Sequence, residues 1–202
     1  MTIFQLSEKI WQEFHKNDPL HLSEEEMAEI EEIQQSIEDS DLELLKNETI
    51  SRSFEFIKDL VYQLTWEESE LLVAGVLRAI GYKTRMSSKG GDGGYDIIAS
   101  PDGLEMTEPI IKAEVKHKTK SKEKVGAPDI RNFIGGLRNS TKGIYVSTTG
   151  FSKDAIQEAD RANFYITLID LDRLVELITE YYEMLDVDTK ALVPLKRIYW
   201  PL

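Results

Sequence analysis

Apolar residues recur three or four positions apart from residue 2 to about residue 58, which is the spacing of one face of an α-helix. Two helices are predicted here. Asp18-Pro19 breaks the first, Ser23 followed by Glu26 reads as a capping box that opens the second, and the second ends between Asp39 and Asp41. The apolar positions that carry the pattern are Ile3, Leu6, Ile10, Phe14, Met27, Ile30, Ile33 and Ile37.

From Trp66 onward, stretches of helical spacing alternate with short β-branched and aromatic runs. The first helix is expected to bury Leu71, Leu72, Gly75, Val76 and Ala79, and Gly81 ends it as a left-handed cap. In chain order the predicted elements are a helix over 66–80, strands over 82–86, 95–99 and 110–116, a helix over 128–138, a strand over 143–147, a helix after Ser152 through 162, a strand over 165–169 and a helix over 171–184. This order predicts an α/β fold, in which helices flank both faces of a mixed five-stranded sheet.

The charge of the chain is unevenly distributed. The net charge of −13 argues at first against a nucleic-acid partner, because proteins that bind phosphates are usually basic. Residues 1–63, however, contain 16 acidic and 5 basic side chains, whereas residues 64–202 contain 21 and 19. We therefore divide the chain into an acidic helical extension, 1–63, and an α/β domain, 64–202. The extension is either a solvated appendage, a dimerisation arm or an element that docks a protein partner.

Composition excludes several kinds of site. The chain has no cysteine, so a disulfide framework, a thiolate nucleophile and a cysteine-based zinc site are all excluded. Three histidines, His15, His21 and His117, are too few and too scattered for a zinc site. No apolar run approaches the roughly 20 residues that span a bilayer, and no signal peptide is visible. We expect a cytoplasmic protein without a membrane partner.

The candidate chemistry lies around Asp96 and the triplet Glu114-Val115-Lys116. Asp96 directly follows the glycine-rich run 89–95, and the triplet ends the strand predicted over 110–116. Residues two apart in a strand share a face, so Glu114 and Lys116 point the same way while Val115 points into the core. If Asp96 lies on a neighbouring strand, two carboxylates and an ammonium group converge. Such a set can hold Mg²⁺ and activate a water molecule against a phosphodiester.

Each candidate has a structural alternative. Glu114 and Lys116 could form an ion pair with no metal, and Asp96 alone could be an acid at a strand edge. The glycine-rich run precedes a strand and lacks a Gly-Lys-Ser/Thr ending, so it does not match a phosphate-binding loop. It fits a turn that lets the backbone approach DNA, or simply a flexible turn. Glu70 is either a solvated helix acid or a residue aimed at the site, and His117 is expected on the surface, facing away from Lys116.

Ordered motifs from Trp66 to Tyr182 resemble the catalytic domain of Mrr-type restriction endonucleases, in the PD-(D/E)xK nuclease superfamily. The segments that carry the resemblance are Glu70-Leu71-Leu72-Val73-Ala74, Gly81-Tyr82, Asp92-Gly93-Gly94-Tyr95-Asp96-Ile97-Ile98, Glu114-Val115-Lys116, Gly135, Lys142-Gly143-Ile144-Tyr145-Val146-Ser147-Thr148-Thr149, Phe151-Ser152, Ala155, Ala159 and Leu168-Ile169-Asp170. The resemblance covers more than half of the chain and keeps the motifs in order.

The resemblance implies a role for each matching residue. Asp96 and Glu114, with the backbone carbonyl of Val115, would bind Mg²⁺, for which Mn²⁺ can substitute; Lys116 would be the catalytic lysine and Glu70 the helix acid. Asp92 would be structural. Many Mrr-type members have Gln where this chain has Glu114, and Glu is the usual superfamily residue. Contacts with double-stranded DNA are expected at Lys89, Gly93, Gly94, Lys118, Lys120 and Lys122.

The expected activity is a Mg²⁺-dependent DNA endonuclease of a restriction or defence system, acting on foreign or modified DNA. Cleavage of both strands requires two active sites, so we expect a homodimer or a higher assembly. Residues 1–63 do not resemble the winged-helix module that often selects the target. The alternatives are a structure-selective or partner-controlled nuclease for branched or damaged DNA, and a nuclease-like module that binds DNA without cleaving it.

Overall fold

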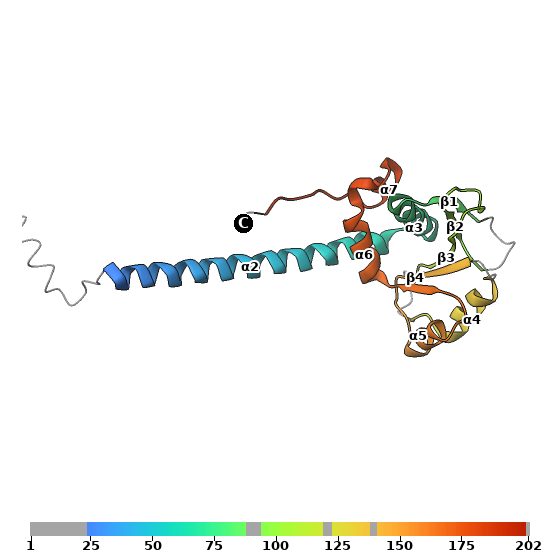
Figure 1. Ribbon diagram of the computed structural model, residues 1–202, viewed down its shortest axis with the longest axis horizontal. Coiled ribbons are helices and arrows are strands. Elements are labelled where there is room, and N and C mark those ends of the chain that lie inside the picture. Colours follow the sequence, from blue (N-terminus) through green and yellow to red (C-terminus); the bar gives the residue numbers. More distant parts are fainter. Residues whose placement is uncertain (1–23, 88–93, 119–122, 138–140, 201–202) are drawn as a thin grey trace, which may run out of the picture. The chain divides into compact units, whose positions relative to one another are not determined.

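The computed structural model describes residues 24–87, 94–118, 123–137 and 141–200 (Figure 1). The chain forms two compact units, Met1–Ser51 and Arg52–Leu202. The helix predicted over the first residues, together with Ser23, lies outside the described residues. Among the described helices, none has the apolar length that a bilayer crossing requires.

Helix α2 runs without interruption from Glu24 to Gln63. The predicted end between Asp39 and Asp41 is therefore wrong. Asp and Ser are only weak helix formers, and the 40 residues of α2 contain neither Gly nor Pro, the residues that break a helix most strongly. In the first unit, the leucines at 44 and 45 are exposed, and the Thr49 hydroxyl donates to the Leu45 carbonyl at 2.8 Å.

The second unit contains a mixed sheet of five strands in the order β1-β2-β3-β4-β5. β1 pairs with β2 and β2 with β3 in antiparallel fashion, whereas β3 with β4 and β4 with β5 are parallel. The strands are β1 Lys83–Met86, β2 Ile97–Ser100, β3 Ile110–Lys116, β4 Thr141–Ser147 and β5 Ile166–Ile169. This confirms the predicted fold class and the positions of all five strands to within two residues.

The helices also follow the predicted order, with one addition after the sheet. They are α3 Trp66–Ile80, α4 Ala127–Gly135, α5 Lys153–Asp160 and α6 Leu171–Glu180, followed by the short 3₁₀ helix η1 Tyr182–Met184 and by α7 Val187–Leu192. Helix α7 was not predicted from the sequence. Asp186 caps its N-terminus, and the Asp186 carboxylate accepts from the backbone N–H of Thr189 at 2.8 Å.

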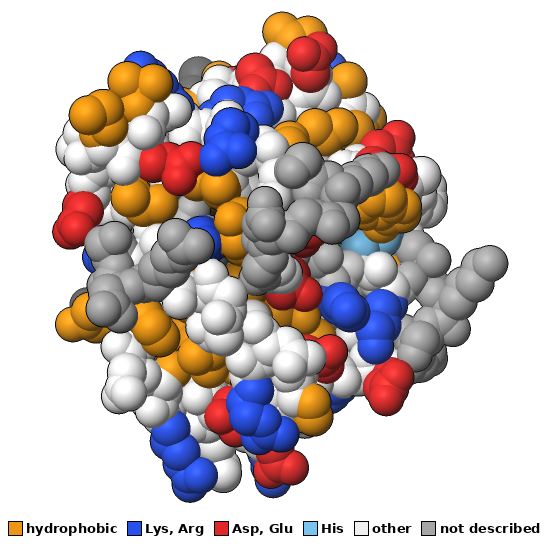
Figure 2. All heavy atoms as spheres, turned by 90° about the vertical axis from the view of Figure 1, so that its right-hand side faces the viewer, with side chains coloured by type: hydrophobic (Ala, Val, Ile, Leu, Met, Phe, Trp, Pro, Cys, Tyr) orange, Lys and Arg blue, Asp and Glu red, His pale blue; other side chains and the backbone are white. Residues whose placement is uncertain are grey.

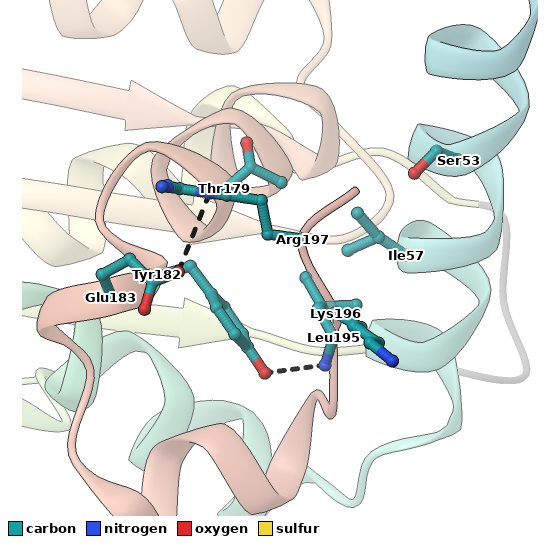
Figure 3. A pocket seen from close by; sticks show the side chains of 8 residues that line it. All are labelled: Ser53, Ile57, Thr179, Tyr182, Glu183, Leu195, Lys196 and Arg197. Atoms are coloured by element: carbon teal, nitrogen blue, oxygen red, sulfur yellow. Dashed lines mark hydrogen bonds and ion pairs between the residues drawn. The ribbon is translucent and has the colours of Figure 1, made fainter. Parts of the chain in front are cut away.

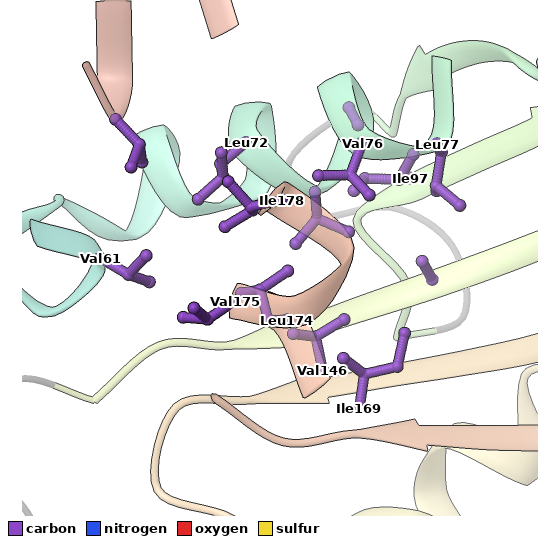
Figure 4. Packing of buried hydrophobic residues seen from close by; sticks show 14 of the residues in the cluster. Val61, Leu72, Val76, Leu77, Ile97, Val146, Ile169, Leu174, Val175 and Ile178 are labelled. Atoms are coloured by element: carbon purple, nitrogen blue, oxygen red, sulfur yellow. The ribbon is translucent and has the colours of Figure 1, made fainter. Parts of the chain in front are cut away.

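Two apolar clusters cover the two faces of the sheet. The larger one joins the second half of α2, α3 and α6 to one face, and Figure 4 shows Leu72 and Val76 of α3 among side chains of α6 and of the strands. The smaller one packs α4 and α5 on the other face. Val146 belongs to the larger cluster and its neighbour Tyr145 to the smaller one, as alternation along a strand requires. Helices on both faces are thus confirmed.

Helix α3 is closed by the left-handed Gly81, as predicted, with φ of 116°. Leu72 and Val76 are buried, and Gly75 lies so close to Thr189 that an added Cβ would stand 2.2 Å from its hydroxyl oxygen. Leu71, however, is exposed, so its predicted burial is wrong. Adjacent helix positions point about 100° apart, and Leu71 falls on the solvent side of the buried face.

Candidate functional site

Asp96 stands immediately before β2, next to the central strand β3. Its backbone N–H donates to the Ala113 carbonyl at 2.8 Å, and its carboxylate oxygen Oδ2 accepts from the backbone N–H of Val115 at 2.8 Å. The side chain of Asp96 therefore reaches the backbone of β3 between Glu114 and Lys116. The structure brings together the three residues that the sequence pattern singled out.

Glu114 lies on the face of β3 that α4 and α5 cover, directly opposite Tyr145 of β4. The Tyr145 hydroxyl donates to Glu114 Oε1 at 3.2 Å. The other oxygen, Oε2, faces the glycine turn, because a Cβ built on Gly94 would lie 3.9 Å from it. Gly94 has φ of 71°, a left-handed conformation that favours glycine. Val115 packs on the opposite face, against the larger core, as predicted.

Both site carboxyls have raised pKa values. Burial is the main cause that raises the pKa of Glu114 to about 7; the nearby Asp96 and Asp129 carboxylates act in the same direction, and the hydrogen bond from Tyr145 and the charge of Lys116 oppose it. Burial also raises the pKa of Asp96, against the Val115 N–H and Lys116. The ionised forms of these two half-buried carboxyl groups, with one lysine beside them, are therefore unfavourable. A bound cation would stabilise these ionised forms.

This donor set fits a hard divalent cation. Mg²⁺ prefers oxygen ligands and binds through one or two carboxylates, with water and phosphate oxygens completing its shell. Across the described ranges, no group of three or more His, Asp or Glu side chains gathers, and Asp96 and Glu114 are the two carboxylates of the predicted site. The role of the Val115 carbonyl stays a prediction. Lys116 acts electrostatically on both acids, which agrees with a position beside them.

Glu70 is half-buried on α3. The charge that shifts the pKa of Asp96 is that of Lys116, and the charges that shift the pKa of Glu114 are those of Asp96, Lys116 and Asp129. The assignment of Glu70 to the site stays a prediction.

His117, which was expected on the surface and facing away from Lys116, is in contact with the end of α2. The ring is half-buried, and its Nε2 lies 2.7 Å from the Leu64 carbonyl oxygen. Leu64 directly follows α2, and the last carbonyls of a helix have no partner within it, so the imidazole N–H supplies one. Burial lowers the pKa of His117, and its Nδ1 is buried with no partner among the described residues.

The second half of α2 makes a further contact at this edge of the sheet. The Tyr62 hydroxyl donates to the Thr148 carbonyl at 2.7 Å, directly after β4. Together with the contact of His117, it ties the end of α2 to the segments that follow β3 and β4. Neither contact was predicted, because both depend on how α2 packs against residues far along the chain.

Of the expected DNA contacts, Gly94 and Lys118 are described. The Lys118 backbone N–H donates to the Thr148 hydroxyl at 3.2 Å, and its ammonium lies 3.6 Å from a Glu123 carboxylate oxygen. Lys112, by contrast, is buried: its ammonium donates to the Gly136 carbonyl at 3.2 Å and lies 4.0 Å from the centre of the Tyr95 ring. The residues Asp92, Lys89, Gly93, Lys120 and Lys122 lie outside the described residues.

One face of the molecule carries acidic and basic side chains close together. In Figure 2, acidic side chains are visible near the middle of the face, and basic side chains lie beside them next to a pale-blue histidine. The face therefore combines the acidic charge that a metal requires with the basic charge that a phosphate backbone requires.

A pocket of about 220 Å³ lies elsewhere, between the second half of α2, the end of α6, η1 and the C-terminal segment (Figure 3). The Tyr182 hydroxyl accepts from the backbone N–H of Leu195 at 2.7 Å at its base. None of the residues of the candidate site lines this pocket. Its lining residues are Ser53, Ile57, Thr179, Tyr182, Glu183, Leu195, Lys196 and Arg197.

Comparison with known proteins adds a family. A family model described as restriction endonuclease, Mrr_cat, matches residues 61–178. The solved structure of the DNA modification-dependent restriction endonuclease AspBHI is similar with a TM-score of 0.53 and 18% identity, over 70% of this chain and 38% of that one. The structure of MspJI restriction endonuclease in complex with a 27-mer oligonucleotide gives a TM-score of 0.44 and 20% identity, over 77% of this chain and 35% of that one. This chain thus spans little more than a third of either protein. No curated protein matches the chain.

Proposed function

Since the chain belongs to the Mrr_cat restriction endonuclease family, we propose that it is a Mg²⁺-dependent endonuclease that hydrolyses phosphodiester bonds of double-stranded DNA in defence against foreign or modified DNA. The observation that carries the proposal is the contact of Asp96 Oδ2 with the Val115 N–H, which places a second carboxylate beside Glu114 and Lys116. A matched family and a site of this composition support the same activity.

In the proposed mechanism, Asp96 and Glu114 would hold the cation, and the Val115 carbonyl would be a further ligand. When bound there, the cation would supply charge stabilisation for the phosphate oxygens and a lower pKa for a bound water. Lys116 orients or deprotonates the attacking water and stabilises charge on the phosphate. Glu70, on α3, would supply a further carboxylate to the site.

The DNA is expected to contact the glycine turn and the segment after β3. Gly94 exposes its backbone beside Glu114, and the backbone of Lys118 is held by Thr148 only two residues after Lys116. We place Lys89, Gly93, Lys120 and Lys122 in the same interface. Because each chain carries one such site, cutting both strands at one locus requires two copies, and we propose a homodimer or higher assembly.

The direct test is a cleavage assay on duplex DNA with Mg²⁺, with Mn²⁺ and with a chelator. The panel contains methylated, hydroxymethylated and unmethylated duplexes, because AspBHI, which has the same fold, is modification-dependent. It also contains a branched junction. We expect metal-dependent cuts in a linear duplex. Cleavage confined to the junction would replace the restriction role by a structure-selective one, and metal-independent cleavage would contradict the proposed mechanism.

A further inference from the structure

Tyr145 is a fully buried residue in the middle of β4, and its hydroxyl reaches the candidate site. In the parallel pairing of β3 with β4 it lies directly opposite Glu114. Its ring packs edge-on against Phe133, at 5.3 Å and 90° between the ring planes, and against Phe151, at 6.0 Å and 76°. Its hydroxyl donates to Glu114 Oε1 at 3.2 Å.

This arrangement fixes a hydrogen-bond donor at a set position. A ring held between two others has little rotational freedom, so the direction of the C–O bond is determined by packing. A tyrosine phenol is protonated at neutral pH, because its ordinary pKa is about 10. The phenol therefore keeps its proton and continues to donate to the carboxylate.

We propose that Tyr145 is a positioning residue for Glu114: it holds Oε1 so that Oε2 is presented towards the Gly94 turn as a metal ligand. Of the two Glu114 oxygens, Oε1 would bind the Tyr145 hydroxyl and Oε2 would bind the cation. Gly94 does not crowd this oxygen, because even an added Cβ would stand 3.9 Å from Oε2, an ordinary van der Waals distance. The inference rests on the proposed function, since it presumes that Glu114 binds a cation.

The Tyr145→Phe variant removes the hydroxyl and keeps the ring between its two neighbours. Without the hydroxyl, Glu114 regains rotational freedom, which cation binding must then remove, and it loses a donor that favours its ionised form. We expect the dissociation constant for Mn²⁺ to rise about 3- to 10-fold. The turnover rate at saturating metal should also fall, because the carboxylate is less well placed, whereas the KM for DNA should not change.

The matched control is Phe151→Leu, which changes the packing against the same ring but leaves the hydroxyl in place. Binding of Mn²⁺ to the full chain without DNA is measured by calorimetry or by electron paramagnetic resonance, beside thermal melting of the metal-free proteins. Weaker binding in Tyr145→Phe together with unchanged binding in Phe151→Leu supports the inference.

Two results would overturn the inference. One is wild-type affinity in Tyr145→Phe; the other is a loss of affinity in both variants that follows their loss of thermal stability, which would make the role purely structural. A wild-type chain that binds no Mn²⁺, or binds it as well after Glu114→Gln, would instead remove the proposed function on which the inference rests.

Discussion

Acidification should weaken metal binding at the site, because protons compete with the cation for the same carboxylates. In the metal-free protein, burial raises the pKa of Glu114 to about 7 and also raises that of Asp96. Metal ligands must be deprotonated before they bind. Near neutral pH, a change of one or two pH units therefore alters the fraction of the protein that is ready to bind.

The size of the effect follows from the pKa of Glu114. For one titrating ligand, the apparent dissociation constant increases by a factor of one plus ten to the power of the pKa minus the pH. With a pKa of about 7, the factor is about 1.1 at pH 8 and about 11 at pH 6. We therefore expect about tenfold weaker binding at pH 6, which corresponds to about 1.4 kcal/mol. Protonation of Asp96 acts in the same direction.

Calorimetric titration with Mn²⁺ across this pH range measures the effect, and repeating it in buffers of different ionisation enthalpy counts the protons released. The Glu114→Gln variant is the control: it should bind more weakly, with a shallower dependence on pH. A wild-type affinity that changes less than about twofold between pH 8 and pH 6 would refute the reasoning.

The same pKa has a consequence for folding. A carboxyl whose pKa is raised in the folded state stabilises the fold while it is protonated, below its ordinary pKa of 4.5, and this contribution is lost as the pH rises through about 7. The metal-free wild type should accordingly lose stability relative to Glu114→Gln over that window. Denaturant titrations at several pH values measure the difference.

Two further expectations concern the fold. Gly75→Ala should lower the free energy of unfolding by about 1–3 kcal/mol or more, because the added Cβ would meet the buried Thr189. Gly135→Ala, at a position where nothing described lies within 4 Å of an added Cβ, should be nearly neutral in the same denaturant titration. Equal effects of the two substitutions would contradict the packing argument. Removing residues 1–51 should leave the melting temperature of the α/β domain nearly unchanged, whereas removing 1–63 should cost about 3–6 kcal/mol through two lost core side chains of α2. Equal stability of the two shortened chains would count against this assignment of the core.

Much of the fold was predictable because its elements carry local signals. The strand over residues 110–116 has the predicted bounds, and Gly81 stops α3 as its conformational freedom suggested. The errors arise where local signals are weak or depend on distant contacts. The acidic positions around residue 40 disfavour a helix only slightly, so α2 continues through them. Whether Leu71 is buried depends on which helices cover α3, and periodicity alone does not show this.

The site was predictable in part for the same reason. Asp96 directly precedes β2 and Glu114 lies on β3, and these strands neighbour each other in both sequence and sheet, so the convergence of the two residues follows from local order. The contacts of Tyr145 and His117 depend on the β3–β4 register and on the packing of α2, which act over long sequence separations. One signal was available: a tyrosine within an apolar strand needs a hydrogen-bond partner for its hydroxyl.

The most direct test of the central claim is cleavage of supercoiled plasmid DNA with Mg²⁺ by the Lys116→Ala variant. The matched control is Lys142→Ala, which removes the same charge from an exposed position on β4. Melting curves establish that both variants fold. The account predicts metal-dependent cleavage by the wild type and by Lys142→Ala, and a loss of at least about 100-fold in rate for Lys116→Ala. Undiminished cleavage by a folded Lys116→Ala variant would contradict it.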